Sequence, residues 1–399
     1  MLRVFLCAFA LTLGLCSTAF AQAEETDFRV RDGYQVTIAS EPMEETRFME
    51  FDDEGTLYVS SPNQGEIKTL RDTDGDGVYE IIATYVSDYP RVHGMHFYDG
   101  WLWFAQSGAI HRGQDTDGDG VADDVVTVVP EGELDSGGGH WWRPIFVTDE
   151  GFYTSIGCDG NITEDLGTGR MILWFYSLDG SEKRKVASGI RNTEKYRYRP
   201  GTTELWGMDH NSDWYGRELG EDRDLQPITD AQPPEEFNLY VDGGFYGHPY
   251  IVGNKLPRLE YYDREDIIQL ADETIPPEYE LPAHAAANGW CFLDDTAHFP
   301  ASFQGDAFIA CHGSWNRSIR TGYSIIRILF DDQTGKPYGH LRIVSTLTSD
   351  NIPAGDNDGV LGRPVDCVVA PDGTILFSCD WTHQIYRIAY TGGETEGME

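Results

Sequence analysis

The hydrophobic pattern of this chain repeats one short phrase six times. Each copy is a turn with glycine, followed by a strand of aromatic or β-branched residues that ends in small or polar residues. The copies read DDEGTLYVSS from Asp52, YDGWLWFAQS from Tyr98, TDEGFYTSIG from Thr148, PGTTELWGMD from Pro200, QGDAFIACHG from Gln304 and PDGTILFSCD from Pro371. Turn chemistry makes each copy the middle of a β-hairpin, and helical periodicity is nearly absent. The pattern therefore predicts an all-β chain.

The spacing of the copies predicts a β-propeller. Gly55, Gly100 and Gly151 are 45 and 51 residues apart, and periods of about 40–50 residues with several strands each are typical of propeller blades. The later steps are longer, and the largest insertion, between Asp209 and Pro282, predicts long loops over one face. We expect a six-bladed β-propeller over residues 22–391, or seven blades if the insertion holds another.

The first 21 residues are predicted to be a secretory leader. Arg3 precedes an apolar run over residues 4–15, and a small-x-small cleavage site ends at Ala21. We therefore expect a soluble periplasmic or secreted protein, with a flexible tail over residues 392–399. Five cysteines remain without the leader, so they cannot all pair. Cys367 and Cys379 flank a turn and could face each other across a hairpin, although directly opposed cysteines often strain a disulfide.

The excess of acidic over basic residues limits the kinds of ligand or partner that the protein is expected to bind. The chain has 29 basic and 67 acidic residues, a net charge of −38. Nucleic acids and anionic membranes need positive surface, so both are excluded as expected partners. The charge favours a neutral ligand, bound cations or simply solubility.

Two copies of DTDGDG predict calcium sites between blade strands. Alternate aspartates on a tight glycine turn direct oxygens at a hard cation. The expected ligands, with the ninth loop position included, are Asp72, Asp74, Asp76, Glu80, Asp115, Asp117, Asp119 and Asp123. The twelfth position is Ala83 or Val126, so neither loop is a complete EF-hand. Plain acidic turns are the alternative.

A histidine-bearing stretch is the first candidate for chemistry. Residues 135–161 gather three glycines, His140, two tryptophans and Arg143 before a turn and a short strand. We interpret the stretch as a β-hairpin whose leading strand brings His140 to the floor of a pocket. Histidine titrates near neutrality and can take a proton. Alternatively, His140 is a satisfied histidine in an aromatic core.

Further clusters lie just before or after the repeated strands. They read RVHGMHF from Arg91, GGGHWWR from Gly137, GIRN from Gly189, MDHNSDW from Met208, CHGSWNRS from Cys311, GRP from Gly362 and CDW from Cys379. Such positions gather near the channel of a propeller. Arginines, histidines and aromatic faces from different blades suit a planar polyanion with a bound cation.

Several of these segments resemble the quinoprotein aldose and sorbosone dehydrogenases. GIRN, then YRPGTTELWGMDHNSD and EEFNLYVDGGFYGHPY, are similar to the central part of that family. HGSWNRS with GYSIIRI, and GRPVDCVVAPDGTILFSCDWTHQIYRI, are similar to its C-terminal blades, and the resemblance covers about residues 47–388. It implies a six-bladed propeller that holds pyrroloquinoline quinone (PQQ) and Ca²⁺ on its axis. It also implies oxidation of an aldose or related sugar aldehyde by hydride transfer to PQQ.

The resemblance also implies roles for individual residues. His140 corresponds to the general base, and Arg191 and Asn192 to the pair at the quinone carbonyls. The positions that line the cofactor's carboxylates and rings are His312, Arg317, Arg363 and Trp381, with Arg47 and His93 ranked lower. The loop that gives Ca²⁺ its oxygens, largely from main-chain carbonyls, holds Asp209, His210 and Asn211.

Two departures from the family and two rival functions remain. Val365 stands where soluble glucose dehydrogenases have a second arginine, and HGSWNR replaces their cofactor lysine, which puts glucose in doubt as the substrate. One rival is a calcium-dependent lactonase or esterase on the same fold. The other is a non-catalytic propeller that binds glycans or proteins. As an oxidoreductase without a fused haem domain, the protein is expected to pass electrons to a separate soluble acceptor.

Overall fold

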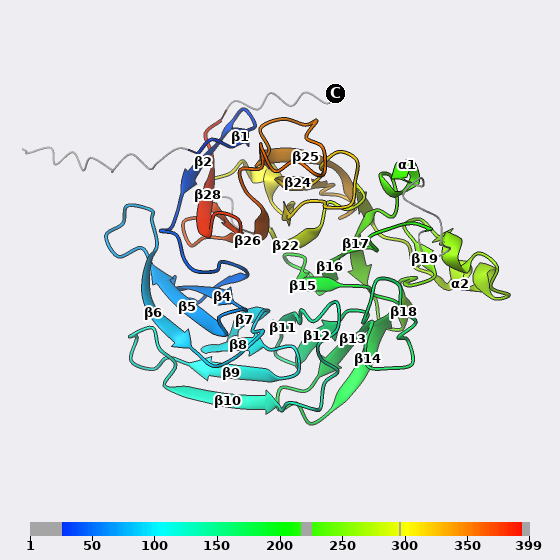
Figure 1. Cartoon of the computed structure of the whole chain (residues 1–399). Coiled ribbons are helices and arrows are strands. Elements are labelled where there is room, and N and C mark those ends of the chain that lie inside the picture. Colours follow the sequence, from blue (N-terminus) through cyan, green and yellow to red (C-terminus); the bar gives the residue numbers. More distant parts are fainter. Residues whose placement is uncertain (1–25, 217–225, 295–296, 393–399) are drawn as a thin grey trace, which may run out of the picture.

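The computed structural model describes residues 26–216, 226–294 and 297–392, and within them six antiparallel sheets surround a central axis (Figure 1). The predicted six-bladed β-propeller is therefore confirmed. The predicted leader, and the predicted tail apart from Gly392, lie outside the described residues. No helix in the described part of the chain has the length and apolar character needed to cross a membrane.

The blades follow one another along the chain, each beginning with its innermost strand. Blade one consists of β3 (Met49–Phe51), β4 (Leu57–Ser61), β5 (Glu66–Arg71) and β6 (Glu80–Val86). Blade two consists of β7 (Met95–Tyr98), β8 (Trp101–Ala105), β9 (Ile110–Gln114) and β10 (Asp124–Val129). Blade three consists of β11 (Ile145–Val147), β12 (Phe152–Ile156), β13 (Ile172–Tyr176) and β14 (Lys183–Ser188). Blade four consists of β15 (Thr193–Tyr198), β16 (Leu205–Asp209), β17 (Glu235–Tyr240) and β21 (Tyr279–Leu281). Blade five consists of β22 (Ala287–Phe292), β23 (Ala307–Cys311), β24 (Ser324–Phe330) and β25 (Pro337–Ser345), with β1 (Arg29–Val30) at its edge.

The sixth blade closes the ring with strands from both ends of the described chain. It consists of β26 (Pro364–Val369), β27 (Ile375–Cys379), β28 (Gln384–Tyr390) and β2 (Tyr34–Ile38). Strand β2 pairs antiparallel with β28, from Tyr34 opposite Tyr390 to Ile38 opposite Tyr386. The strand that leads into blade one is thereby hydrogen-bonded into the last blade, which closes the ring around the axis.

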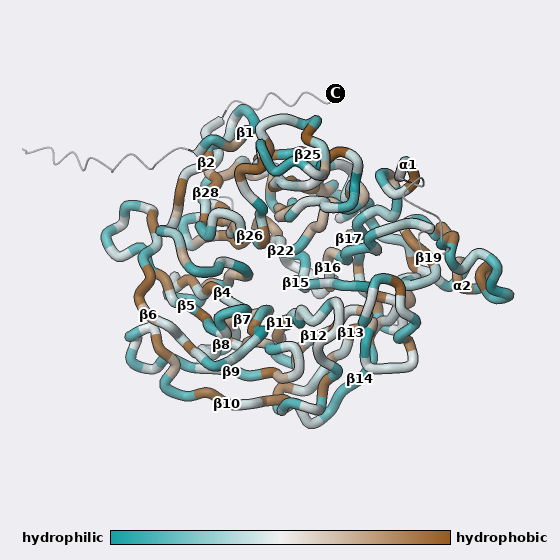
Figure 2. Tube along the Cα trace, viewed as in Figure 1, coloured by the Kyte–Doolittle hydropathy of each residue, from teal (hydrophilic) through white to brown (hydrophobic). Residues whose placement is uncertain are grey.

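The six repeated phrases form the second strand of each blade: β4, β8, β12, β16, β23 and β27. Almost every residue of these strands is buried. Neighbouring blades cover both faces of each strand, which is why the hydrophobic run is continuous rather than alternating. Hydrophobic segments recur along the blade strands in Figure 2, while many of the connecting loops are hydrophilic.

The insertion between blade-four strands adds short elements but no seventh blade within the described residues. It holds α1 (Gln226–Thr229), β18 (Gly244–Phe245), β19 (Ile251–Val252), β20 (Leu256–Pro257), η3 (Leu259–Tyr261) and α2 (Ile267–Glu273), and a further short helix, η4 (Ala301–Phe303), lies in blade five. In Figure 1, α1, β19 and α2 lie outside the ring, beside β17 and β18. These elements lie beside blade four, and the Arg258 guanidinium that precedes η3 donates to the carbonyl of Trp214 in the loop after β16.

All five described cysteines are buried and free. Cys367 lies opposite Phe377, and Cys379 lies opposite Pro364. The suggested pairing of Cys367 with Cys379 is therefore not formed, because the strand register places the two residues at different levels of the hairpin.

Two ion pairs, one buried and one partly buried, cross the axis between the inner strands. The Lys195 ammonium on β15 lies 2.7 Å from a carboxylate oxygen of Asp366 on β26, and Arg197 lies 2.6 Å from Glu50 on β3. The second oxygen of Asp366 accepts the backbone N–H of Met49. These pairs connect blade four to blades one and six.

Replacing Asp366 by alanine should destabilise the fold by about 3–5 kcal/mol, because the Lys195 ammonium is then buried without its partner. Urea unfolding followed by tryptophan fluorescence measures the change. Asp366→Asn is the matched control, since it keeps the acceptor and removes the charge. A loss below about 1 kcal/mol for Asp366→Ala contradicts this role.

Candidate functional site

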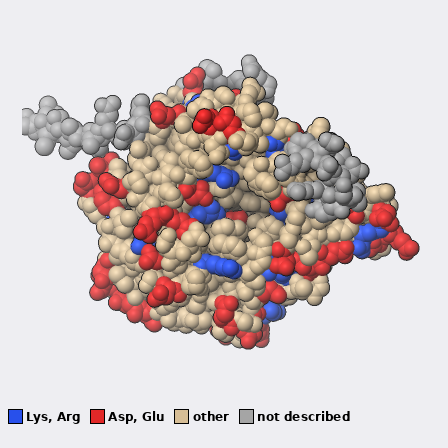
Figure 3. All heavy atoms as spheres, viewed as in Figure 1, with Lys and Arg blue, Asp and Glu red and all other residues tan. Residues whose placement is uncertain are grey.

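A cavity of about 240 Å³ opens where the inner strands begin, and we call it the axial cavity. It brings together eight of the predicted site residues: Arg47, His140, Arg191, Asn192, His210, Asn211, His312 and Arg363. These residues either precede an inner strand or follow a second strand, so the propeller gathers them at one mouth of its axis. In Figure 3, basic atoms lie around the middle of the face, and acidic atoms are abundant at its edge.

A larger cavity, of about 510 Å³, lies at the other ends of the inner strands. Its rim is acidic, with Asp52, Asp53, Glu54 and Asp294, and its described lining contains no histidine. We therefore place the candidate chemistry in the smaller axial cavity, where imidazole, guanidinium and carboxylate groups meet.

His140 lies in the loop before β11 and not on a leading strand, which corrects the predicted hairpin. Gly137 and Gly138, which precede it in this loop, have positive φ values of 70° and 75°. The Nδ1 atom of His140 donates to the carbonyl of Cys158 at 2.8 Å. Since a carbonyl only accepts, the lone pair of the imidazole lies on Nε2. Burial and the neighbouring Arg191 charge lower the pKa of His140 to about 3, so the imidazole is a neutral acceptor.

Close backbone packing holds His140 beside Arg191. A Cβ atom on Gly157 would lie 2.3 Å from the Arg191 carbonyl oxygen and 2.7 Å from Cβ of His140. Only glycine allows this approach without displacement of one of its neighbours. The loop after β12 therefore fixes the relative positions of the imidazole and the guanidinium.

The positively charged guanidinium of Arg191 donates all its hydrogen bonds to neutral oxygens. Its Nε atom donates to the Asn161 carbonyl at 2.9 Å, Nη2 to the Asn161 amide oxygen at 3.1 Å, and Nη1 to the His210 carbonyl at 3.2 Å. The carboxylate of Asp213 lies 3.9 Å away and is partly exposed. The guanidinium is thus fixed in orientation but only weakly compensated in charge.

The carboxylate of Asp209 is used inside the protein. It accepts the backbone N–H of Arg191 at 2.9 Å, that of Asn192 at 2.6 Å, and the Thr193 hydroxyl at 3.1 Å. Asp209 is buried and does not line the axial cavity. A role for its carboxylate as a metal ligand is therefore not supported, because the group holds the start of β15 in place.

Arg363 resembles Arg191 in its partners. Its Nε atom donates to the His312 carbonyl at 3.3 Å and Nη2 to the Gly313 carbonyl at 3.0 Å. Both acceptors are neutral. Guanidinium groups from blades four and six therefore lie at the same cavity without a close carboxylate partner.

Arg47 differs because it is paired with a carboxylate. Its Nη1 atom lies 2.7 Å from Asp380, and its guanidinium lies over the Trp142 ring at 4.6 Å. Asp380 also lies 3.0 Å from Nε2 of His312. Burial opposes ionisation of Asp380, but His312 and Arg47 hold its pKa well below the usual range. The sequence interpretation missed Asp380, although it lies within the quoted CDW cluster.

Glu194 is a second residue that sequence reasoning missed. Burial opposes its ionisation, but His93, His210 and Arg47 lower its pKa to about 2. His93 lies 3.3 Å from Glu194 and is completely buried, so it does not line the axial cavity. The cofactor contact expected of His93 is therefore not supported. Its imidazole instead lies against the Glu194 carboxylate.

Two further predicted cofactor residues lie outside the axial cavity. Arg317 donates to the carbonyl of Ala283 at 3.0 Å and lines a different cleft. Trp381 is 46% exposed and is not among the residues that line the cavity. The cofactor contacts expected of these two residues are therefore not supported. Trp142, His284 and Trp315 line the cavity instead. Trp142 and Trp315 lie within the quoted GGGHWWR and CHGSWNRS clusters, whereas no quoted motif contains His284.

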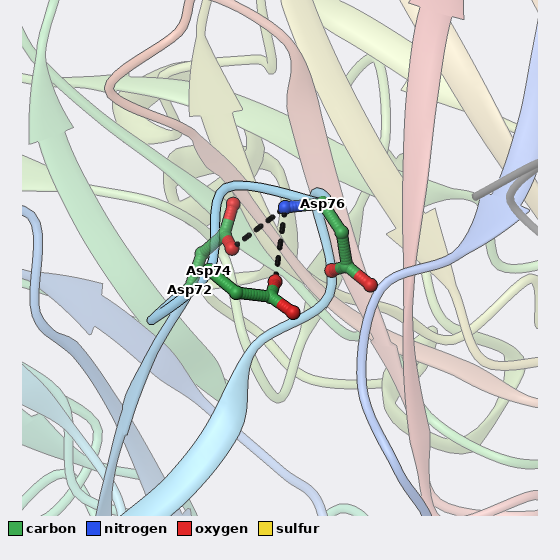
Figure 4. A group of neighbouring side chains, drawn as sticks. All are labelled: Asp72, Asp74 and Asp76. Carbon is green, nitrogen blue, oxygen red and sulfur yellow. Dashed lines mark hydrogen bonds between the residues drawn. The ribbon is translucent and has the colours of Figure 1, made fainter. Parts of the chain in front are cut away.

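The two DTDGDG loops gather acidic groups on the outer hairpins of blades one and two. Asp72, Asp74 and Asp76 converge in one loop (Figure 4), and Asp115, Asp117 and Asp123 converge in the other. Their oxygens also accept backbone N–H groups within the turns, as Asp72 does from Gly75 at 2.8 Å. Figure 4 shows two such bonds at the amide of Asp76.

Two expected ligands lie outside these acidic groups. Glu80 accepts the backbone N–H and the hydroxyl of Thr73, at 3.0 and 2.9 Å. Asp119 accepts the backbone N–H of Val121 at 2.9 Å. Their carboxylates are used to shape the turns. Across the described residues, only these two loops bring three acidic or imidazole ligands together.

The axial cavity suits a flat polyanion. Arg191 and Arg363 can add carboxylate partners without losing their present hydrogen bonds. The amide oxygen of Asn192 and one oxygen of Glu235 are buried without a hydrogen-bond partner, so the cavity also offers acceptors to a ligand. Buried polar atoms of this kind are costly unless something satisfies them.

Family models match both parts of the chain. One, described as a domain of unknown function (DUF7133), matches residues 21–224, and another, described as TrAA12-like, matches residues 263–391. A curated uncharacterized protein from Borreliella burgdorferi is 30% identical over 215 residues, which cover 54% of this chain and 51% of the relative. The chain thus matches about half the length of that relative.

Solved structures with the same fold include sugar oxidoreductases. The calcium structure of the Trichoderma reesei family AA12 protein has a TM-score of 0.76 at 18% identity, over 94% of this chain and 99% of its own. The holo PQQ domain of pyranose dehydrogenase from Coprinopsis cinerea has a TM-score of 0.77 at 18% identity, over 92% and 99%. The soluble aldose sugar dehydrogenase of Escherichia coli has a TM-score of 0.61 at 17% identity, over 90% and 99%. The predicted resemblance is confirmed at the level of the fold.

Proposed function

The chain belongs to the DUF7133 family, and we propose that it is an exported quinoprotein oxidoreductase that oxidises an aldose or a related sugar aldehyde. One observation carries the proposal. Two guanidinium groups whose hydrogen bonds all end on neutral oxygens line the same cavity as a neutral histidine with an available Nε2 lone pair. The PQQ-containing proteins of the same fold support the choice of cofactor.

In this proposal the arginines of the cavity bind the cofactor, and His140 transfers the proton. Arg191 and Arg363 bind carboxylate groups and stabilise negative charge, since both are fixed before the ligand arrives. When bound, PQQ accepts a hydride and Ca²⁺ acts as a Lewis acid on its carbonyl. His140 takes the proton of the sugar hydroxyl at Nε2. Because Arg191 is close, the resulting imidazolium is disfavoured, and it releases the proton from Nε2 to solvent water.

Calcium in the axial cavity would need oxygen ligands that the protein does not already use. Glu235 offers one such oxygen, and Asp213 lines the same wall. We propose these two carboxylates, together with a main-chain carbonyl of the loop over residues 209–211 other than that of His210, which already accepts from Arg191, as its ligands. The proposed electron acceptor is a separate soluble carrier.

A lactonase function has less support. That chemistry needs acidic ligands that converge on one metal ion at the axis. The described groups of three converging carboxylates lie in the outer DTDGDG loops instead. Lactonase chemistry at such a metal ion also gives no role to the guanidinium groups of Arg191 and Arg363.

Replacing His140 by alanine should lower sugar oxidation by about 10²–10⁴-fold, because the general base is lost. The test loads the mature protein with PQQ and Ca²⁺ and follows reduction of an artificial dye across aldoses and sorbosone. Quinone binding, measured by titration, should persist in the variant. His298→Gln, at an exposed histidine, is the matched control. Wild-type protein that binds PQQ but oxidises none of these sugars contradicts the function, and unchanged turnover in His140→Ala removes the base.

The pH dependence of turnover should lack an acidic limb near pH 6–7. The depressed pKa of about 3 keeps His140 neutral throughout the mildly acidic range, so kcat/KM should stay level from pH 8 down to about pH 5. A limb at pH 6–7 contradicts the neutral-base assignment.

A further inference from the structure

A third cavity, of about 430 Å³, lies in blade five next to the end of β21, and we call it the side cleft. Three arginines line it, Arg317, Arg320 and Arg342, with Asp350 as the one acidic residue of its described lining. This ratio is the reverse of that in the whole chain, which has 67 acidic and 29 basic residues. A local excess of guanidinium groups on an acidic protein requires an explanation.

The first two arginines have no acidic hydrogen-bond partner. Arg317 donates from Nη1 to the Ala283 carbonyl at 3.0 Å, and its buried Nε atom has no partner. Arg320 donates from Nε to the Asp356 carbonyl at 2.9 Å and from Nη2 to the amide oxygen of Asn357 at 2.7 Å. Its third contact is the Tyr323 hydroxyl. Both charges are therefore oriented by neutral groups, as at the axial cavity.

The third arginine shares its acidic partner. Asp350 lies 2.8 Å from Arg342 and 2.9 Å from Arg29 on β1. One carboxylate thus compensates two guanidinium groups. Asp230 is the acidic residue that most affects Arg317, and it does not line the cleft. The cleft therefore keeps an excess of positive charge.

The segment over residues 282–286 separates the side cleft from the axial cavity. Pro282 and Ala285 line the cleft, whereas His284 and Ala286 line the axial cavity. The two cavities share no lining residue. Arg317 lines the cleft side of this wall and donates to the Ala283 carbonyl within it.

We propose that the side cleft binds an anionic phosphate or sulfate group, either free or as an ester on a sugar. Guanidinium groups bind such oxygens in pairs of parallel hydrogen bonds, and those of Arg317 and Arg342 lie at the cleft. Thr321 and Ser324 add hydroxyl groups to the lining. The proposal does not depend on the oxidoreductase function, because it concerns a different cavity.

Isothermal titration of the mature protein at low ionic strength tests the proposal with phosphate, sulfate, glucose 6-phosphate and glucose. The wild type should bind the three anions and not glucose. Arg317→Gln and Arg342→Gln should each lower the affinity at least about 10-fold, which corresponds to about 1.4 kcal/mol. PQQ binding should be unchanged in both variants, which separates this site from the cofactor cavity. Tighter binding of glucose 6-phosphate than of phosphate identifies an ester ligand, and equal binding identifies the free ion.

Arg184→Gln is the matched control, because it removes the same charge from an exposed ion pair with Asp242 on another blade. It should change the anion affinity less than about twofold. Equal losses in the control and in the cleft variants would show that only net charge matters, and absence of anion binding to the wild type would also overturn the proposal. Arg342 is partly exposed, so Arg342→Gln remains a valid test even where Arg317→Gln disturbs the fold.

Discussion

The axial cavity depends on guanidinium groups that main-chain carbonyls hold in place. An arginine that is paired with a carboxylate has its charge neutralised, whereas one that donates to carbonyls is equally fixed but remains available to an anion. Arg191 and Arg363 are of the second kind, and Arg47, which pairs with Asp380 at 2.7 Å, is of the first. Preorganised charge in a water-poor cavity binds an anion more strongly than the same charge in solvent.

The propeller provides this arrangement because its rigid parts surround the axis. Pairing of β2 with β28 closes the ring, and the Lys195–Asp366 pair connects inner strands across the centre. An irregularity in the pairing of β15 between Thr193 and Tyr196 lets adjacent residues serve different cavities. Glu194 lines the axial cavity, and Lys195 lines the larger cavity at the opposite mouth.

Much of the fold could be predicted from the sequence because its signal is local. A glycine turn followed by a buried strand recurs once per blade, so blade number and the convergence of strand ends follow from counting. Side-chain direction is a different matter. Arg317 follows the same second strand as His312, yet it turns behind the wall over residues 282–286. His140 lies in the loop before β11, where two successive glycines with positive φ turn the chain just before it. Asp380 and Glu194 were missed because their importance lies in partners far apart in the chain.

The most direct test of the central claim is a titration of PQQ into the mature wild type and into Arg191→Gln and Arg363→Gln. The account predicts measurable binding to the wild type and about 30–150-fold weaker binding to each variant, since each removes a charge-assisted contact worth about 2–3 kcal/mol. Affinities that are equal in all three proteins would contradict it.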